Sequence, residues 1–158
     1  MLNMKIICVG RMKFHAQAAN EYEKRLRGLV KLQISEIPEI RLPDGPSEAQ
    51  IFSALLKEGA LISSMILERS FSVAMCIEGK TLSSAEFAET LAGLTVKGVS
   101  HVCFIVGGSF GLHDSVKKRS DMLLSMSSMT FPHHLARVML LEQIYRAVMI
   151  NSGSKYHK

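Results

Sequence analysis

The sequence has few of the features that mark disordered, membrane-spanning or exported proteins. Only 4 of its 158 residues are proline and 21% are charged, whereas 47% are hydrophobic. This composition is typical of a folded core and argues against extended disorder. No apolar run approaches the roughly 20 residues that a membrane-spanning helix needs. The apolar run at residues 4–9 lacks the length and the cleavage pattern of a signal peptide. We therefore expect a cytoplasmic protein that makes no membrane contact.

Cysteine is also scarce, and its placement argues against two common roles. Cys8, Cys76 and Cys103 are odd in number, widely spaced and each set in an apolar run. This spacing fits neither a disulfide framework nor a zinc motif. Free cysteine is among the most buried residue types. We expect three buried, reduced thiols and no metal site.

The net charge of +5 is concentrated towards the end of the chain. Residues 1–100 carry 12 Lys and Arg against 11 Asp and Glu, whereas residues 101–158 carry 7 against 3 and five of the six histidines. A basic region suggests an anionic partner, of which RNA is one. The excess is equally compatible with an ordinary solvated surface, so charge alone does not decide the function.

The apolar pattern predicts strands that alternate with helices. We expect strands at 4–9, 32–37, 71–77, 101–106 and 126–129, and helices at 14–27, 48–67, 84–96, 114–123 and 133–151. Ser47 with Gln50 and Ser83 with Glu86 match capping boxes that open two of these helices. Strands separated by helices favour an α/β fold with a mostly parallel sheet and helices on both faces. The length predicts one domain over residues 1–158.

In an open α/β sheet, ligands bind beyond the carboxyl ends of the strands. Three stretches take that position, at residues 75–80, 107–112 and 126–134. The glycine-rich stretch Gly107 to Gly111 has neither the Lys-Ser/Thr ending of a P-loop nor the G-x-G-x-x-G pattern. From its residues alone it is a tight turn before a helix, or a loop that lets a flat ligand approach the backbone closely.

The stretch at 124–134 combines small hydroxyl residues and two methionines with no acidic, lysine or arginine side chain. Such a composition suits an apolar slot that offers backbone hydrogen bonds. His133 and His134 follow Pro132 at the expected helix start. We expect adjacent histidines to point in different directions, which disfavours joint binding of one metal, and each could equally be a surface or capping residue.

The last expected helix is apolar on more than one side, which indicates burial against more than one surface. In so small a domain, a second subunit is a natural partner for that surface. Arg137 and Arg146 interrupt the apolar positions, and either is compatible with an ordinary solvated or ion-paired arginine.

Several segments of the chain together resemble a known protein family. The segments FIVGGSFGLH at 104–113, MTFPH at 129–133 and EQIYRA at 142–147, with Arg137-Val138 and the tail Tyr156-His157-Lys158, resemble the ribosomal large-subunit pseudouridine methyltransferase H family of the SPOUT superfamily. IEGK at 77–80 and the Glu21-Tyr22 region match the same pattern. The resemblance covers essentially the whole chain, and its C-terminal block is the most specific part.

The resemblance implies a C-terminal trefoil knot, which the periodicity does not indicate and the general rule against knots disfavours. It also implies a homodimer that methylates N3 of a pseudouridine in 23S ribosomal RNA, free or in the assembled ribosome, with S-adenosylmethionine as cofactor and no metal. The residues that it implies for the cofactor pocket are Met75, Gly107, Met126, Ser127, Ser128, Met129, Thr130 and Phe131. The chain departs from the family at Cys76, where an acid is common, and at Phe110, where smaller or polar residues are common.

N3 of the acceptor carries a proton, so the site needs a base or donors that stabilise the pyrimidine anion. Our candidates are His133 as a base, Arg137 as a bidentate donor, Tyr156 for stacking or hydrogen bonding, and His157. The residues do not identify the base, and solvent is an alternative acceptor of the proton. Two other functions stay open: a SPOUT enzyme that acts on tRNA or a ribose oxygen, and a non-catalytic RNA-binding protein.

Overall fold

The computed structural model, which describes residues 1–156, contains one five-stranded sheet. Its strands are β1 (Asn3–Val9), β2 (Lys31–Ile37), β3 (Phe71–Thr81), β4 (His101–Val106) and β5 (Met122–Ser125). They lie in the order β2-β1-β4-β3-β5, and every neighbouring pair is parallel. The predicted α/β fold with a parallel sheet is confirmed.

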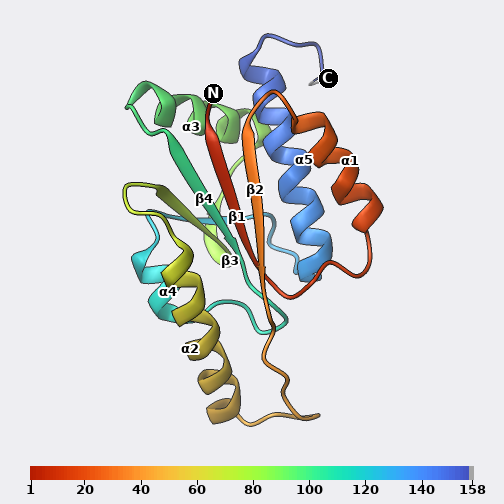
Figure 1. Ribbon diagram of the computed structural model, residues 1–158, viewed down its shortest axis with the longest axis vertical. Helices are drawn as coiled ribbons and strands as arrows, with labels where there is room; N and C mark the ends of the chain where they lie inside the picture. Colours follow the sequence, from red (N-terminus) through yellow and green to blue (C-terminus); the bar gives the residue numbers. More distant parts are fainter. Residues whose placement is uncertain (157–158) are drawn as a thin grey trace.

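Helices cover both faces of the sheet (Figure 1). They are α1 (Ala16–Leu26), α2 (Glu48–Met65), α3 (Ser84–Val96), α4 (Asp114–Arg119) and α5 (His133–Asn151). Helices α1, α3 and α5 pack with one face of the strands around Ile6 and Phe104, and α2 and α4 pack with the other face around Ile7 and Ile105. The sheet therefore separates two apolar layers, which explains why strands such as β4 are apolar on both sides.

Local signals in the sequence account for the helix starts. Both predicted capping boxes form: Ser47 accepts a hydrogen bond from the backbone of Gln50, and Ser83 accepts one from the backbone of Glu86. In each box the serine backbone N–H in turn donates to a side-chain oxygen of the same Gln50 or Glu86. Helix α5 spans the predicted residues, 133–151.

The predicted end of α4 and the predicted position of β5 were both wrong by about four residues. Helix α4 ends at Arg119, and the strand is 122–125, whereas 126–129 belongs to a loop. The cause is a contact far away in the sequence. The Asp121 carboxylate accepts hydrogen bonds from the backbone N–H and the hydroxyl of Ser72 on β3, at 2.7 and 2.8 Å. This anchor aligns the residues after 121 with β3.

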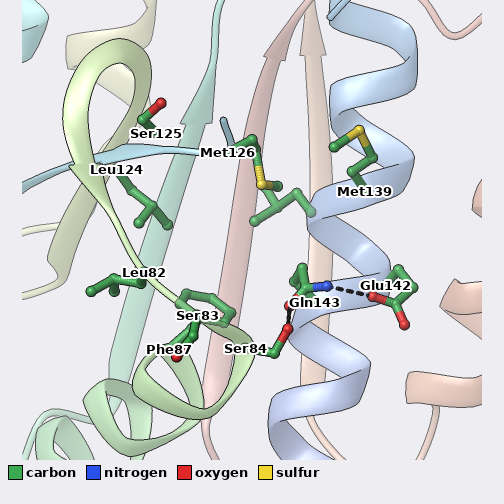
Figure 2. Close-up of a pocket in the computed structure, with 11 residues that line it drawn as sticks. Leu82, Ser83, Ser84, Phe87, Leu124, Ser125, Met126, Met139, Glu142 and Gln143 are labelled. Carbon is green, nitrogen blue, oxygen red and sulfur yellow. Dashed lines mark hydrogen bonds between the residues drawn. The ribbon is translucent and has the colours of Figure 1, made fainter. Parts of the chain in front are cut away.

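Strand β3 is longer than predicted because it pairs with β5 twice. Leu124 is in register with Met75 and again with Lys80, and the register is broken between them. The residues between Met75 and Lys80 therefore bulge around Leu124. In Figure 2 the segment that carries Leu124 runs across this pale green loop.

Helix α5 is covered by its own chain on several sides. It packs against α1, α3 and the sheet, and none of the residues at 133–150 is exposed. These neighbours within the chain cover much of the apolar surface of α5. No helix in the described part of the chain is long and apolar enough to cross a membrane.

Candidate functional site

A cavity of about 890 Å³ opens at the carboxyl ends of β4 and β5, beside the bulge of β3. Its walls are the bulge of β3, the glycine loop after β4 and the segment after β5, and the last two take the position predicted for ligand sites in open sheets. Of the residues implied for the cofactor pocket, all but Ser128 line this one cavity: Met75, Gly107, Met126, Ser127, Met129, Thr130 and Phe131.

One wall is the glycine loop after β4. Its backbone turns back on itself through a bridge between Gly108 and Gly111, in which the Gly111 N–H donates to the Gly108 carbonyl at 3.1 Å. A Cβ on Gly107 would lie 2.5 Å from the Gly111 carbonyl oxygen. Gly111 itself has φ +81°, a conformation that other residues rarely adopt. The glycines therefore permit a compact loop whose backbone forms the cavity wall.

The opposite wall is the segment that joins β5 to α5. The Ser125 hydroxyl donates to the Ser127 carbonyl at 2.9 Å, and the Ser127 hydroxyl accepts the N–H of Met129 at 3.0 Å. These short-range bonds fold a segment that has no regular structure, and they leave Met129 73% exposed at the rim. Phe110, which departs from the family pattern, lines the cavity from the glycine-loop side and is 48% exposed.

The rings of the two histidines at the start of α5 lie next to each other. Their ring centroids are 4.1 Å apart. His133 lines the cavity, whereas His134 is outside the lining. Burial and the neighbouring His133 lower the pKa of His134 below its usual range, so His134 stays neutral at neutral pH. No cluster of three or more potential metal ligands occurs among residues 1–156.

Arg137 does not reach the cavity. Its side chain is 3% exposed, one guanidinium nitrogen donates to Glu36 at 2.5 Å, and another donates to the Gly10 carbonyl at 2.8 Å. Its Nε has no hydrogen-bond partner among the described residues. In this arrangement the guanidinium group that we expected to donate to the substrate is directed towards the ends of β1 and β2.

The tail is also separate from the cavity. Tyr156 packs its ring against Tyr145 at 4.9 Å, lies under the guanidinium of Arg146, and places its hydroxyl 3.5 Å from a carboxylate oxygen of Glu142. It is therefore anchored on α5. Glu142 is about 13 Å along the helix from His133, at 1.5 Å per residue. His157 lies outside the described residues.

Glu142 also borders a second cavity of about 360 Å³, on the other side of the segment 124–126. Figure 2 shows Ser84, Gln143 and Glu142 joined by hydrogen bonds along its floor, with Met126 and Met139 nearby. The pair Glu142 and Arg146 forms an ion pair on α5 at 2.6 Å. Tyr156 therefore belongs to the surroundings of this second cavity.

The cysteines follow the prediction in part. Cys8 and Cys103 are buried, and burial raises the pKa of Cys8 to about 12 and that of Cys103 to about 11. Both are therefore protonated and unreactive. Cys76 is only half-buried because it lines the main cavity beside the ion pair of Lys117 and Glu78.

Sequence reasoning missed two residues beside the site, Glu36 and Glu39. Glu36 is the second-last residue of β2 and Glu39 follows the strand, and the rule that places ligands beyond the carboxyl ends of strands applies to β2 as well. Glu39 accepts the backbone N–H of Ser109 at 2.9 Å, so it contacts the glycine loop directly. The predicted strand at 32–37 placed both residues near its carboxyl end, but no glycine-rich or hydroxyl-rich motif drew attention to this segment.

Comparison with known proteins gives a consistent result. A family model described as predicted SPOUT methyltransferase matches residues 2–157. Similar relatives include the ribosomal RNA large subunit methyltransferase H of Streptococcus pyogenes serotype M5 (strain Manfredo), at 45% identity, and that of Leuconostoc citreum (strain KM20), at 41%. Each alignment covers 99% of this chain and 100% of the relative.

Among solved structures, a probable methylase family protein from Haemophilus influenzae Rd KW20 is similar at a TM-score of 0.54 and 12% identity. The alignment covers 99% of this chain and 70% of the other. At this identity the likeness concerns the fold alone.

Proposed function

The chain belongs to the SPOUT methyltransferase family, among the ribosomal RNA large subunit methyltransferases H, and we propose that it methylates N3 of a pseudouridine in 23S ribosomal RNA with S-adenosylmethionine. Membership makes it a methyltransferase that uses a methyl donor. The observation that carries the finer proposal is that Met75, Gly107 and the segment 126–131, apart from Ser128, converge on one cavity.

The cavity fits S-adenosylmethionine in size and chemistry. Its volume of about 890 Å³ lies within the range of roughly 300–1,000 Å³ that is typical of small-molecule sites. The glycine loop presents backbone where a side chain at 107 would not fit, and Met75, Met126 and Phe131 offer apolar surface to an adenosine group. When bound, S-adenosylmethionine supplies an electrophilic methyl group on a sulfonium.

The chain's own residues supply positioning and proton removal. Holding the acceptor in line with the methyl group provides much of the acceleration in a direct displacement. We assign the acceptance of the N3 proton to His133, which lines the cavity at the start of α5. Its Nε2 is buried without a partner among the described residues.

The C-terminal tail supplies candidate residues for contact with the RNA base. Tyr156 and His157 remain assigned to the RNA base, by stacking or hydrogen bonding. Tyr156 has to leave its contact with Tyr145, or act at a site other than the main cavity of its own chain, because it lies beside the second cavity. Arg137 takes part in RNA binding only if it exchanges Glu36 for the substrate.

We further propose a trefoil knot at β5, a homodimer and a single domain over residues 1–158 in the cytoplasm. The double pairing of Leu124 with Met75 and Lys80 supports the knot, because the bulge of β3 surrounds the passing strand. The half-buried apolar residues Val138 and Val148 on α5 support the dimer. The relatives' names support ribosomal RNA as the partner, and we propose that this RNA is recognised either free or in the assembled ribosome.

Mass spectrometry of ribosomal RNA nucleosides tests the reaction. Cells with and without the gene should differ in N3-methylpseudouridine from the large subunit, and the purified protein with S-adenosylmethionine should restore it on ribosomes from the deficient strain. Methylation of tRNA or of a ribose oxygen would assign a different SPOUT activity. Failure to bind S-adenosylhomocysteine would favour a non-catalytic RNA-binding protein.

A further inference from the structure

We propose that Glu36 and Glu39, at the end of β2, are positioning residues that hold the two walls of the cofactor cavity relative to each other. The inference rests on the proposed function, since it concerns the same cavity. Glu36 holds the start of α5, which carries His133, and Glu39 holds the glycine loop. Only Ile37 and Pro38 separate the two, so one short segment connects both walls.

Glu36 acts through Arg137. Its Oε1 accepts a hydrogen bond from the Arg137 guanidinium at 2.5 Å and another from the backbone N–H of Met12 at 3.1 Å. A guanidinium that is 3% exposed has to be paired, because an unpaired buried charge is strongly destabilising. Arg137 is one helical turn after His133 and also donates to the Gly10 carbonyl. The first turn of α5 is therefore tied to the ends of β1 and β2.

Glu39 acts on the glycine loop. Its Oε1 accepts the Ser109 N–H at 2.9 Å. A Cβ on Gly108 would lie 2.7 Å from this same oxygen, so the carboxylate occupies the space that a side chain at 108 would need. Its Oε2 faces Gly10, where a Cβ would lie 3.5 Å from Oε2 and 3.7 Å from Nε2 of His133. Gly10 is thus the point where the carboxylate and the histidine approach each other.

The position of β2 explains why side chains are needed for this task. In the sheet, β1 separates β2 from β4, and β3 and β5 lie farther still. The backbone of β2 therefore ends at a distance from the cavity, and its acidic side chains bridge that distance. Neither Glu36 nor Glu39 lines the cavity, so we call them positioning residues and not catalytic ones.

The coupling between Glu39 and Gly108 provides a sharp test. We would measure S-adenosylhomocysteine affinity by calorimetry, together with kcat and the KM for S-adenosylmethionine on ribosomes, for Glu39→Ala, Gly108→Ala and the double variant. We expect each single change to weaken affinity at least tenfold. In the Glu39→Ala background, Gly108→Ala should cost less than threefold further, because the carboxylate that it displaces is gone. Strictly additive losses would overturn the inference.

Conservative variants separate positioning from general stability. Glu39→Gln keeps an oxygen that accepts the Ser109 N–H, so we expect affinity within threefold of the wild type. Glu36→Gln should lower kcat more than it raises the KM for S-adenosylmethionine, because it releases α5 and His133. The control Glu68→Gln changes an exposed residue just before β3, at the opposite end of the strand from the cavity, and should change nothing. Thermal unfolding of each variant shows whether it folds.

The outcomes also separate this inference from the proposed function. If the wild type binds S-adenosylhomocysteine and Glu39→Ala binds equally well, the inference is wrong and the function stands. If Glu36→Gln does not fold, the Glu39 and Gly108 measurements still decide. If the wild type itself fails to bind, the proposed function is wrong and the inference falls with it.

Discussion

The backbone of Gly79 on β3 lies directly against the backbone of Leu124 on β5. A Cβ built on Gly79 would be 2.6 Å from both the amide nitrogen and the carbonyl carbon of Leu124. Leu124 is also the residue that pairs with β3 on both sides of the bulge, at Met75 and at Lys80. The close approach of the two chains therefore depends on the absence of a side chain at position 79.

We expect Gly79→Ala to destabilise the protein by about 1–3 kcal/mol, the usual cost of overpacking, because backbone atoms are the obstacle and cannot rotate away. Thermal unfolding should show a loss of several degrees, at about 2–4 °C per kcal/mol for a chain of this size. Gly93→Ala is the matched control. Gly93 lies within α3 with open space at its Cβ, so alanine should be neutral or stabilising there. Equal melting temperatures for the two variants would contradict this prediction.

Cofactor binding should depend on Gly107 and not on metal. We expect S-adenosylhomocysteine to bind in the presence of EDTA, and Gly107→Val to weaken binding at least tenfold. The structure adds a physical reason, since a Cβ at 107 would collide with the carbonyl of Gly111 and open the loop. Calorimetry measures both affinities. Unchanged affinity in Gly107→Val would remove the glycine loop from the cofactor site.

The predicted homodimer can be measured by light scattering, which should give about twice the chain mass. Val138→Glu or Val148→Glu should shift the protein towards the monomer, because both side chains are half-buried on α5 and a buried, unpaired carboxylate is costly. Val96→Glu is the control, since Val96 is 88% exposed at the end of α3. A wild type that stays monomeric at micromolar concentration would rule the dimer out.

Removal of Tyr156–Lys158 should separate RNA methylation from cofactor binding. We expect methylation of ribosomes to fall at least tenfold, about 1.4 kcal/mol of transition-state stabilisation, while cofactor affinity and dimer mass stay nearly unchanged. Tyr156→Phe keeps the ring contact with Tyr145 and removes the hydroxyl near Glu142, so it distinguishes packing from hydrogen bonding. Full activity of the truncated enzyme would leave His133 as the main candidate.

Glu58 should make stability depend on pH near neutrality. It is 4% exposed, and burial, followed by the nearby Glu39 carboxylate, raises its pKa to about 7. Between its ordinary pKa of about 4.5 and pH 7, the folded protein holds a proton that the unfolded chain has lost. The stability that this proton contributes is present at low pH and is lost as pH rises through 7.

Glu58→Gln should therefore become more stable relative to the wild type between pH 5 and pH 8. The change is at most about 3 kcal/mol, since one pKa unit corresponds to about 1.4 kcal/mol. Melting temperatures at the two pH values measure it, with the exposed Glu68→Gln as control. A melting-temperature difference that does not change with pH would show that Glu58 titrates normally.

Much of the secondary structure was determined by the sequence alone. The capping boxes at Ser47 and Ser83 formed as predicted, and so did β4 and α5, because their signals lie within a few residues of each other. The parallel α/β class followed from the alternation of these elements. The family followed from motifs at 104–113 and 129–147, which the comparisons confirm.

The tertiary structure decided what depends on partners far away in the sequence. Asp121 bonds Ser72 and thereby sets the start of β5, which no local pattern could show. Arg137, an ordinary helix arginine in the sequence, is buried because Glu36 and Gly10 are there to receive it. Tyr156 packs on Tyr145 because the chain turns back along α5. Periodicity and capping depend on neighbours along the chain, whereas buried charges and strand registers depend on which distant groups the fold brings into contact.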